Sequence, residues 1–107
     1  MKYTLYFMNQ CPTCHEFIKM LNKSNVDFEL KDIDETVGIE RGKYRWEQLD
    51  LAREYNVSSF VPFMVIEDTE GNKSLFVGGV KGQEKENVVI FESHEDGVEK
   101  LKNILNL

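Results

Sequence analysis

The sequence predicts a single α/β domain in which strands and helices alternate along the chain. A strand pattern, a helical pattern and a second strand pattern open the sequence and form a β-α-β unit. A second helical pattern is followed by two strand patterns joined by a short turn, and a third helical pattern closes the chain. The 107 residues are enough for one hydrophobic core and too few for two, so we expect one domain over residues 1–107.

The first strand and the first helix are expected on either side of a short loop. Residues 2–7, KYTLYF, combine aromatic and β-branched side chains in an apolar run, which is typical of a buried strand. Pro12 suits a first helical turn, where the missing N–H is not needed. The polar stretch 22–25 is expected to end the helix. One apolar face at helical spacing is formed by Cys14, Phe17, Ile18 and Leu21.

The middle of the chain is expected to hold a half-buried strand, a loop and a second helix. Residues 26–33 alternate between apolar and charged side chains, with Val26, Phe28 and Leu30 on the apolar side. The segment 34–43 has two glycines and many charges, which indicates a loop. A helix is predicted over 44–56, with a packing face at threefold spacing formed by Trp46, Leu49, Ala52 and Tyr55.

The last third of the sequence predicts a hairpin and a closing helix. Residues 62–68 form a short apolar run, 69–72 are a turn signal, and 73–79 suit the second strand of the hairpin. Residues 86–93 fit either a short edge strand or an irregular crossing. Ser93 begins a pattern similar to a capping box. The inner face of the last helix is then expected to consist of Val98, Leu101, Ile104 and Leu105.

The composition restricts the classes of partner and the compartment. A net charge of −6 argues against non-specific binding of nucleic acid and against docking on anionic lipid. The N-terminal apolar run is too short for a secretory signal. No stretch approaches the roughly 18 apolar residues of a membrane span. We therefore expect a cytoplasmic protein with neither a nucleic-acid nor a membrane partner.

The chain has only two cysteines, Cys11 and Cys14, and they stand in the motif CPTCH between the first strand and the first helix. In a reducing cytosol such a pair is more often catalytic or metal-binding than a structural disulfide. Unpaired N–H groups at a helix start stabilise a thiolate, which is the reactive form. We expect Cys11 to attack a substrate disulfide and Cys14 to resolve the resulting mixed disulfide, with Pro12 and Thr13 setting the geometry of the pair.

Three stretches of the chain resemble the glutaredoxin branch of the thioredoxin-fold family. They are YFMNQCPTCHEFIKML, SSFVPFMVI and LFVGG. The resemblance implies a thioredoxin fold with a central mixed four-stranded sheet flanked by helices, and the activity of a thiol–disulfide oxidoreductase. It also implies a cis bond between Val61 and Pro62 that faces the cysteines, with the Val61 backbone pairing with a bound peptide or glutathione. Gly78 and Gly79 would allow a ligand to approach the backbone closely.

The same resemblance implies the substrates and the reductant. Disulfides in proteins or small molecules would be reduced, and glutathione or a reductase of the thioredoxin-reductase type would restore the dithiol without a bound cofactor. The chain departs from the family at Met8, where many members have Lys, and at 80–82, where an acidic pair is often found; residues 51–59 resemble thioredoxin more closely. We hypothesise that the anchor for a substrate carboxylate is instead one of Arg41, Lys43 and Arg45.

Other interpretations of the motif remain open from the sequence. The two cysteines could be inert and buried, and C-x-x-C-H is also a haem attachment sequence. A zinc site would need about four ligands, and the soft candidates are only Cys11, Cys14, His15 and His94. An iron–sulfur cluster shared between two subunits, or a non-catalytic binding module, is the alternative function. His15 is expected to be a partly exposed helix residue or to tune the field near Cys14, and the two glycines could simply end a strand.

Overall fold

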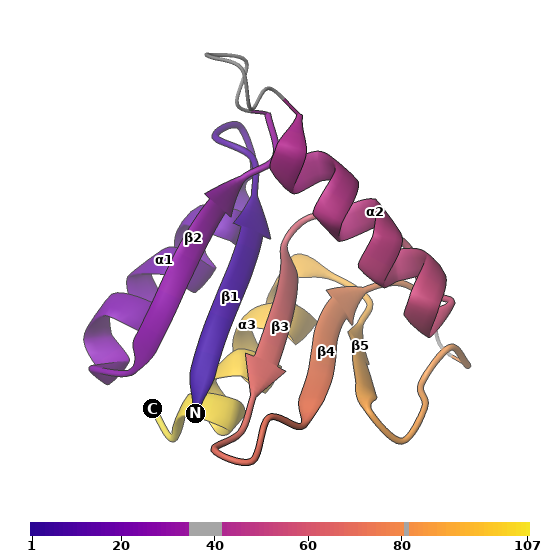
Figure 1. Ribbon diagram of the computed structural model, residues 1–107. Coiled ribbons are helices and arrows are strands. Elements are labelled where there is room, and N and C mark those ends of the chain that lie inside the picture. Colours follow the sequence, from indigo (N-terminus) through magenta and orange to yellow (C-terminus); the bar gives the residue numbers. More distant parts are fainter. Residues whose placement is uncertain (35–41, 81) are drawn as a thin grey trace.

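Figure 1 shows the computed structural model of the protein, which describes residues 1–34, 42–80 and 82–107. The predicted α/β class is confirmed. The loop expected over 34–43 lies for the most part outside the described residues. The elements, in chain order, are β1 (Lys2–Phe7), α1 (Pro12–Ser24), β2 (Asp27–Asp32), α2 (Lys43–Tyr55), β3 (Phe63–Glu67), β4 (Lys73–Gly78), β5 (Val88–Phe91) and α3 (His94–Leu105).

The strands form one mixed sheet in the order β2-β1-β3-β4-β5. β1 and β2 are parallel, as are β4 and β5, whereas β3 runs antiparallel to both of its neighbours. Among the residues that the structure describes, β1, β2, β4 and β5 therefore point in the same direction and β3 points the other way. The hairpin expected around the turn at 69–72 is confirmed as β3 and β4.

The expected four-stranded sheet is wrong in its number of strands, because β5 adds a fifth strand beside β4. Of the two structures considered for residues 86–93, the short edge strand is the one observed. Val88, Ile90 and Phe91 are buried, so their apolar side chains leave water when the strand joins the sheet. Their backbone at the same time pairs with the open edge of β4, from Leu75 to Gly78.

The two faces of the sheet have separate hydrophobic cores. α1 and α3 cover one face and α2 lies across the other (Figure 1). The α1–α3 side includes Phe17, Leu21, Leu101 and Leu105 from the helices, packed on β1, β3 and β4. The opposite side is built from Tyr6, Ile33, Ala52, Phe63, Val65, Leu75, Val77, Val88 and Ile90.

Two predicted core positions are exposed. The side chain of Trp46 is 61% exposed, so the packing face proposed for the second helix is wrong at this position, whereas Ala52 and Tyr55 do pack against the core. The face of α2 that contacts the sheet consists of Tyr44, Gln48, Leu51, Ala52 and Tyr55, and Trp46 lies outside it. Leu30 is 38% exposed, because β2 is an edge strand and its outer side has no neighbour.

The helix ends follow simple capping rules. Ser93 is the N-cap of α3, as its sequence pattern predicted, and its hydroxyl accepts the N–H of Asp96 at 3.1 Å. The helices α1, α2 and α3 each end at an asparagine in the left-handed conformation that favours Asn or Gly after a helix. These residues are Asn25, Asn56 and Asn106. Among the residues that the structure describes, no helix has the length and apolar character needed to cross a membrane.

Candidate active site

The cysteine motif, the Val61–Pro62 pair and the Gly78–Gly79 pair lie at one end of the sheet. Tyr6, near the end of β1, pairs with Phe63 at the start of β3, and Phe63 pairs with Val77 near the end of β4. The loop that follows β1 carries the cysteines, the residue before Phe63 is Pro62, and β4 ends at Gly78. The topology thus brings three separate parts of the chain to the same end of the sheet, toward which the arrowheads of β1 and β4 point (Figure 1).

The three helices also begin at this end, because α1, α2 and α3 each follow one of the strands that point toward it (Figure 1). A helix N-terminus has unpaired N–H groups and the positive end of the helix dipole. Each helix start therefore favours a negative charge within its first turn, although the whole chain carries a net charge of −6.

Cys11 is the N-cap of α1 and is partly exposed. Its backbone is extended, with φ −108° and ψ 107°, and Pro12 occupies the first helical turn as predicted. The sulfur of Cys11 accepts a hydrogen bond from the backbone N–H of Cys14 at 3.1 Å. A cysteine sulfur in this position does what a serine or aspartate oxygen usually does at a helix start, and a thiolate accepts such a bond better than a neutral thiol.

Cys14 has the opposite environment. It lies one turn into α1 and its side chain has no exposed surface. Burial, and the hydrogen bond that its thiol makes with Cys11, raise the pKa of Cys14 far above the usual range of a thiol. The pair therefore consists of one accessible sulfur that accepts an N–H donor and one shielded sulfur that keeps its proton.

Hydrogen bonds brace the loop that carries the cysteines. The N–H of Cys11 donates to the carbonyl of Met8 at 3.3 Å. His15 is exposed, as expected, and its Nε2 lies 2.6 Å from the carbonyl oxygen of Asn9. The side-chain amide of Asn9 in turn donates to Asp32 at 3.3 Å, which joins the loop to the end of β2. His15 thus contacts the loop backbone.

The Val61–Pro62 bond is cis, as the resemblance implied. Pro62 is fully buried and Val61 is partly buried, whereas Phe60 just before them is 68% exposed. The segment is held by Gln48, the only buried polar side chain among the described residues, whose amide donates to the carbonyl of Ser59 at 2.7 Å. The backbone next to Val61 is therefore tied to α2.

Gly78 and Gly79 are in close contact with other parts of the chain. A Cβ atom at Gly78 would lie 3.3 Å from the ring of Phe91, and one at Gly79 would lie 2.5 Å from the side-chain oxygen of Gln83. The N–H of Gly79 donates to the carbonyl of Phe91 at 3.1 Å. The ring of Phe91 therefore restricts a side chain at Gly78, whereas the contact at Gly79 is with the end of the flexible Gln83 side chain.

A hollow of about 320 Å³ lies beside the dithiol loop and is lined by Met8, Ile33, Asp34 and Arg45. Arg45 also donates to the side-chain oxygen of Gln48 at 3.2 Å. Of the two suggested carboxylate anchors that the structure describes, Arg45 and Lys43, Arg45 lines this hollow together with Met8. Lys43 is an exposed residue at the start of α2, and Arg41 lies outside the described residues.

Within residues 1–34, 42–80 and 82–107, no three His, Cys, Asp or Glu side chains come together in a way that could hold a metal ion. Comparison of the chain with protein-family models, with curated proteins and with solved structures finds no match. What can be said of function therefore comes from this site and from the resemblance of its motifs.

Two residues that bond to parts of the site were not predicted from the sequence, because they are far from those parts along the chain. Gln48 stands in a charged helix, and nothing in the spacing distinguishes it from an exposed glutamine; its burial follows from how α2 crosses the sheet. His94 was considered only as a remote zinc ligand, yet its Nδ1 lies 2.7 Å from the hydroxyl of Thr13. Its one signal was its place directly after the predicted helix cap, at Ser93.

Proposed function

We propose that this protein is a thiol–disulfide oxidoreductase of the glutaredoxin type, built on a thioredoxin fold with one additional edge strand. The order β2-β1-β3-β4, with β3 antiparallel, agrees with the four-stranded sheet that the motif resemblance implies. The observation that carries the proposal is the difference between the two cysteines. Cys11 is partly exposed and its sulfur accepts the N–H of Cys14, whereas the sulfur of Cys14 is buried.

The first step is the attack of Cys11 on a substrate disulfide. The Cys11 thiolate forms a new S–S bond with one substrate sulfur, and the bond between the two substrate sulfurs breaks. The departing sulfur leaves as a thiolate and takes a proton from water. The N–H of Cys14 and the helix dipole stabilise the negative charge on Cys11 before the attack.

The second step releases the substrate. The Cys14 thiol loses its proton, attacks the Cys11 sulfur and forms the Cys11–Cys14 disulfide, while the second substrate sulfur leaves as a thiol. Two electrons have then passed from the dithiol to the substrate. The raised pKa of Cys14 keeps this buried thiol protonated in the reduced protein, which leaves the accessible Cys11 as the first nucleophile.

Two further electrons must come from another thiol donor to close the cycle. Two glutathione molecules, or the dithiol of a reductase, would reduce the Cys11–Cys14 disulfide and themselves become oxidised. In this proposal the protein works in the cytoplasm, where such donors keep thiols reduced. The substrate would be a protein or small-molecule disulfide.

The surroundings of Cys11 suggest where a substrate would lie. The backbone of Val61 would pair with an extended substrate segment at the end of the sheet, and the exposed ring of Phe60 offers an apolar contact beside it. Arg45, in the hollow next to Met8, would bind a substrate carboxylate such as those of glutathione. Gly78 and Gly79 would border the same edge of the sheet.

The test is disulfide turnover with two different reducing systems. The purified protein is assayed with hydroxyethyl disulfide and with insulin, once with glutathione plus glutathione reductase and once with thioredoxin reductase. We expect turnover with the first system and its loss in Cys11→Ser. Turnover with thioredoxin reductase alone would place the protein in the thioredoxin class. If a fully reduced sample does not reduce either substrate even stoichiometrically, the proposed function is wrong.

A further inference from the structure

The hydrogen bond between Thr13 and His94 joins the dithiol motif to the last helix. The hydroxyl of Thr13 and Nδ1 of His94 are 2.7 Å apart, although 81 positions separate the two residues in the sequence. Thr13 stands between the two cysteines, and the next residue supplies the N–H that bonds to the Cys11 sulfur. A contact at Thr13 therefore bears directly on the peptide group that faces the reactive sulfur.

Close packing of α1 and α3 brings the two residues together. A Cβ atom at Gly97 would lie 3.3 Å from the ring of Phe17 on α1 and 2.9 Å from the ring of Phe91. Thr13 is one turn before Phe17 on α1, and His94 is one turn before Gly97 on α3. The Thr13–His94 pair is therefore the next contact along the same two helix faces.

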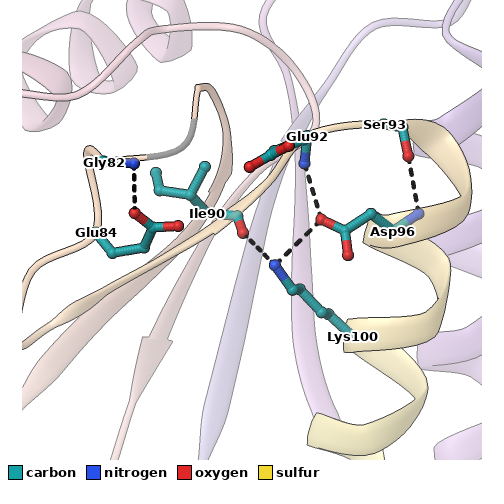
Figure 2. Close-up of polar contacts among 7 residues, drawn as sticks. All are labelled: Gly82, Glu84, Ile90, Glu92, Ser93, Asp96 and Lys100. Atoms are coloured by element: carbon teal, nitrogen blue, oxygen red, sulfur yellow. Dashed lines mark hydrogen bonds and ion pairs between the residues drawn. The ribbon is translucent and has the colours of Figure 1, made fainter.

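The start of α3 is itself fixed in place. The Asp96 carboxylate accepts the N–H of Glu92 at 2.9 Å and contacts the ammonium group of Lys100 at 3.1 Å. Figure 2 shows both contacts as dashed lines. Lys100 also donates to the carbonyl of Ile90 in β5 at 2.7 Å, and Ser93 caps the helix. These bonds join the first two turns of α3 to the end of β5 and so position the start of the helix.

The first residue of α3 is His94. We propose that His94 is a positioning residue of the dithiol site, which holds the first turn of α1 through Thr13 so that the N–H of Cys14 stays directed at the Cys11 sulfur. The inference rests on the proposed function. It also gives a role to β5 and the junction before α3, which lie outside the four strands that the resemblance implies. Their contacts with α3 position His94 next to Thr13.

The test measures kcat and KM separately for disulfide reduction. His94→Ala should lower kcat by about 3- to 10-fold, the equivalent of one net hydrogen bond, with KM unchanged because His94 is not expected to touch the substrate. His94→Asn, whose amide can both donate and accept, should retain activity within about twofold of the wild type. Glu95→Ala changes the exposed neighbour in the same turn and should leave both constants unchanged.

A double-mutant cycle shows whether the effect passes through Thr13. If it does, Thr13→Val combined with His94→Ala is no slower than the slower of the two single variants. Multiplying effects, or a kcat of His94→Ala equal to that of the wild type, would overturn the inference. A wild-type protein without turnover, or an active Cys11→Ser variant, would refute the proposed function itself. Thermal unfolding of each variant confirms that the measured kcat belongs to folded protein.

Discussion

The backbone N–H of Cys14 donates a 3.1 Å hydrogen bond to the sulfur of Cys11, so the buried member of the pair supplies the donor for the accessible member. The hydrogen bond closes the first turn of α1, where a serine or aspartate cap would otherwise stand. The two cysteines are thereby given different chemistry by the same short helix start. Cys11 is accessible to an incoming disulfide, whereas Cys14 is buried one turn further along the helix.

The burial of Cys14 should make the protein less stable at alkaline pH. Above about pH 8.5 the Cys14 thiol loses its proton in the unfolded chain but keeps it in the folded protein, where its pKa is raised. The unfolded state then binds fewer protons, so the free energy of unfolding falls as pH rises, by up to about 1.4 kcal/mol per pH unit. Urea unfolding between pH 8 and 9.5 under reducing conditions measures this slope.

The control for this measurement is Cys14→Ala. The variant lacks only the Cys14 thiol, so the difference between the slopes of the two proteins reports on this group. The variant should lose stability more slowly with rising pH, whatever its stability at neutral pH. Equal slopes in the two proteins would show that the Cys14 thiol ionises as easily in the folded state as in the unfolded state.

The hydroxyl of Tyr6 should contribute to the attachment of α2 to the sheet. It donates to the carboxylate of Glu47 at 3.0 Å, and Lys31 donates to the same oxygen at 2.7 Å. Although burial alone would raise the pKa of Glu47, the bonds from Lys31 and Tyr6 hold it below its usual range. Tyr6→Phe should lower the free energy of unfolding by about 1–2 kcal/mol, because a bond to a charged acceptor is lost.

Tyr3→Phe is the matched control, since Tyr3 lies on the same strand and is equally buried. Its hydroxyl reaches only the sulfur of Met1, a weak acceptor, at 3.8 Å. The change should cost less than about 0.5 kcal/mol. Denaturant unfolding measures the free energy of unfolding of both variants. An equal decrease in the two would mean that the hydrogen bond from Tyr6 to Glu47 does not stabilise the protein.

The close approach of α3 at Gly97 predicts that even a methyl group is too large there. In Gly97→Ala the new Cβ would lie 2.9 Å from the buried ring of Phe91, and the crowding should cost about 1–3 kcal/mol. Better helix propensity returns about 1 kcal/mol. We expect a net loss of stability by calorimetry, against almost no change for Lys102→Ala on the exposed side of α3. A stabilised Gly97→Ala would contradict the packing.

Arg45 is predicted to bind the carboxylate of a glutathione-containing substrate. Arg45→Glu should raise KM for glutathione-linked turnover roughly 3- to 10-fold, the size expected for a lost exposed ion pair plus repulsion. Arg53→Glu is the matched control, because Arg53 lies on the same helix but does not line the hollow beside Met8. If both variants behave as the wild type does, the hollow is not the carboxylate site.

Much of the fold could be predicted because the local patterns and the packing agree. Three local patterns predicted the element that is observed. They are the apolar run of β1, the helical spacing of Phe17 and Leu21, and the N-cap at Ser93. Trp46 was misplaced because α2 has no clean apolar face, so threefold spacing could be drawn through the wrong side. Leu30 was misplaced because alternation does not reveal that a strand lies at the edge of a sheet.

The site was predictable where its chemistry lies in consecutive residues, as in the motif from Cys11 to Cys14. It was not predictable where tertiary contacts make it. The burial of Gln48 depends on how α2 crosses the sheet, and the contact of His94 with Thr13 depends on the close approach permitted by Gly97. β5 belongs to this second group, because its apolar residues gain a partner only once β4 is in place.

The most direct measurement traps the mixed disulfide on single-cysteine variants. Cys14→Ser and Cys11→Ser, both folded and reduced, are mixed with glutathione disulfide at neutral pH, and the adduct is followed by intact mass and peptide mapping. We predict rapid addition of one glutathione to Cys11 in Cys14→Ser and almost none to Cys14 in Cys11→Ser. Equal addition to both variants, or faster addition to Cys14, would contradict the assignment of Cys11 as the attacking sulfur.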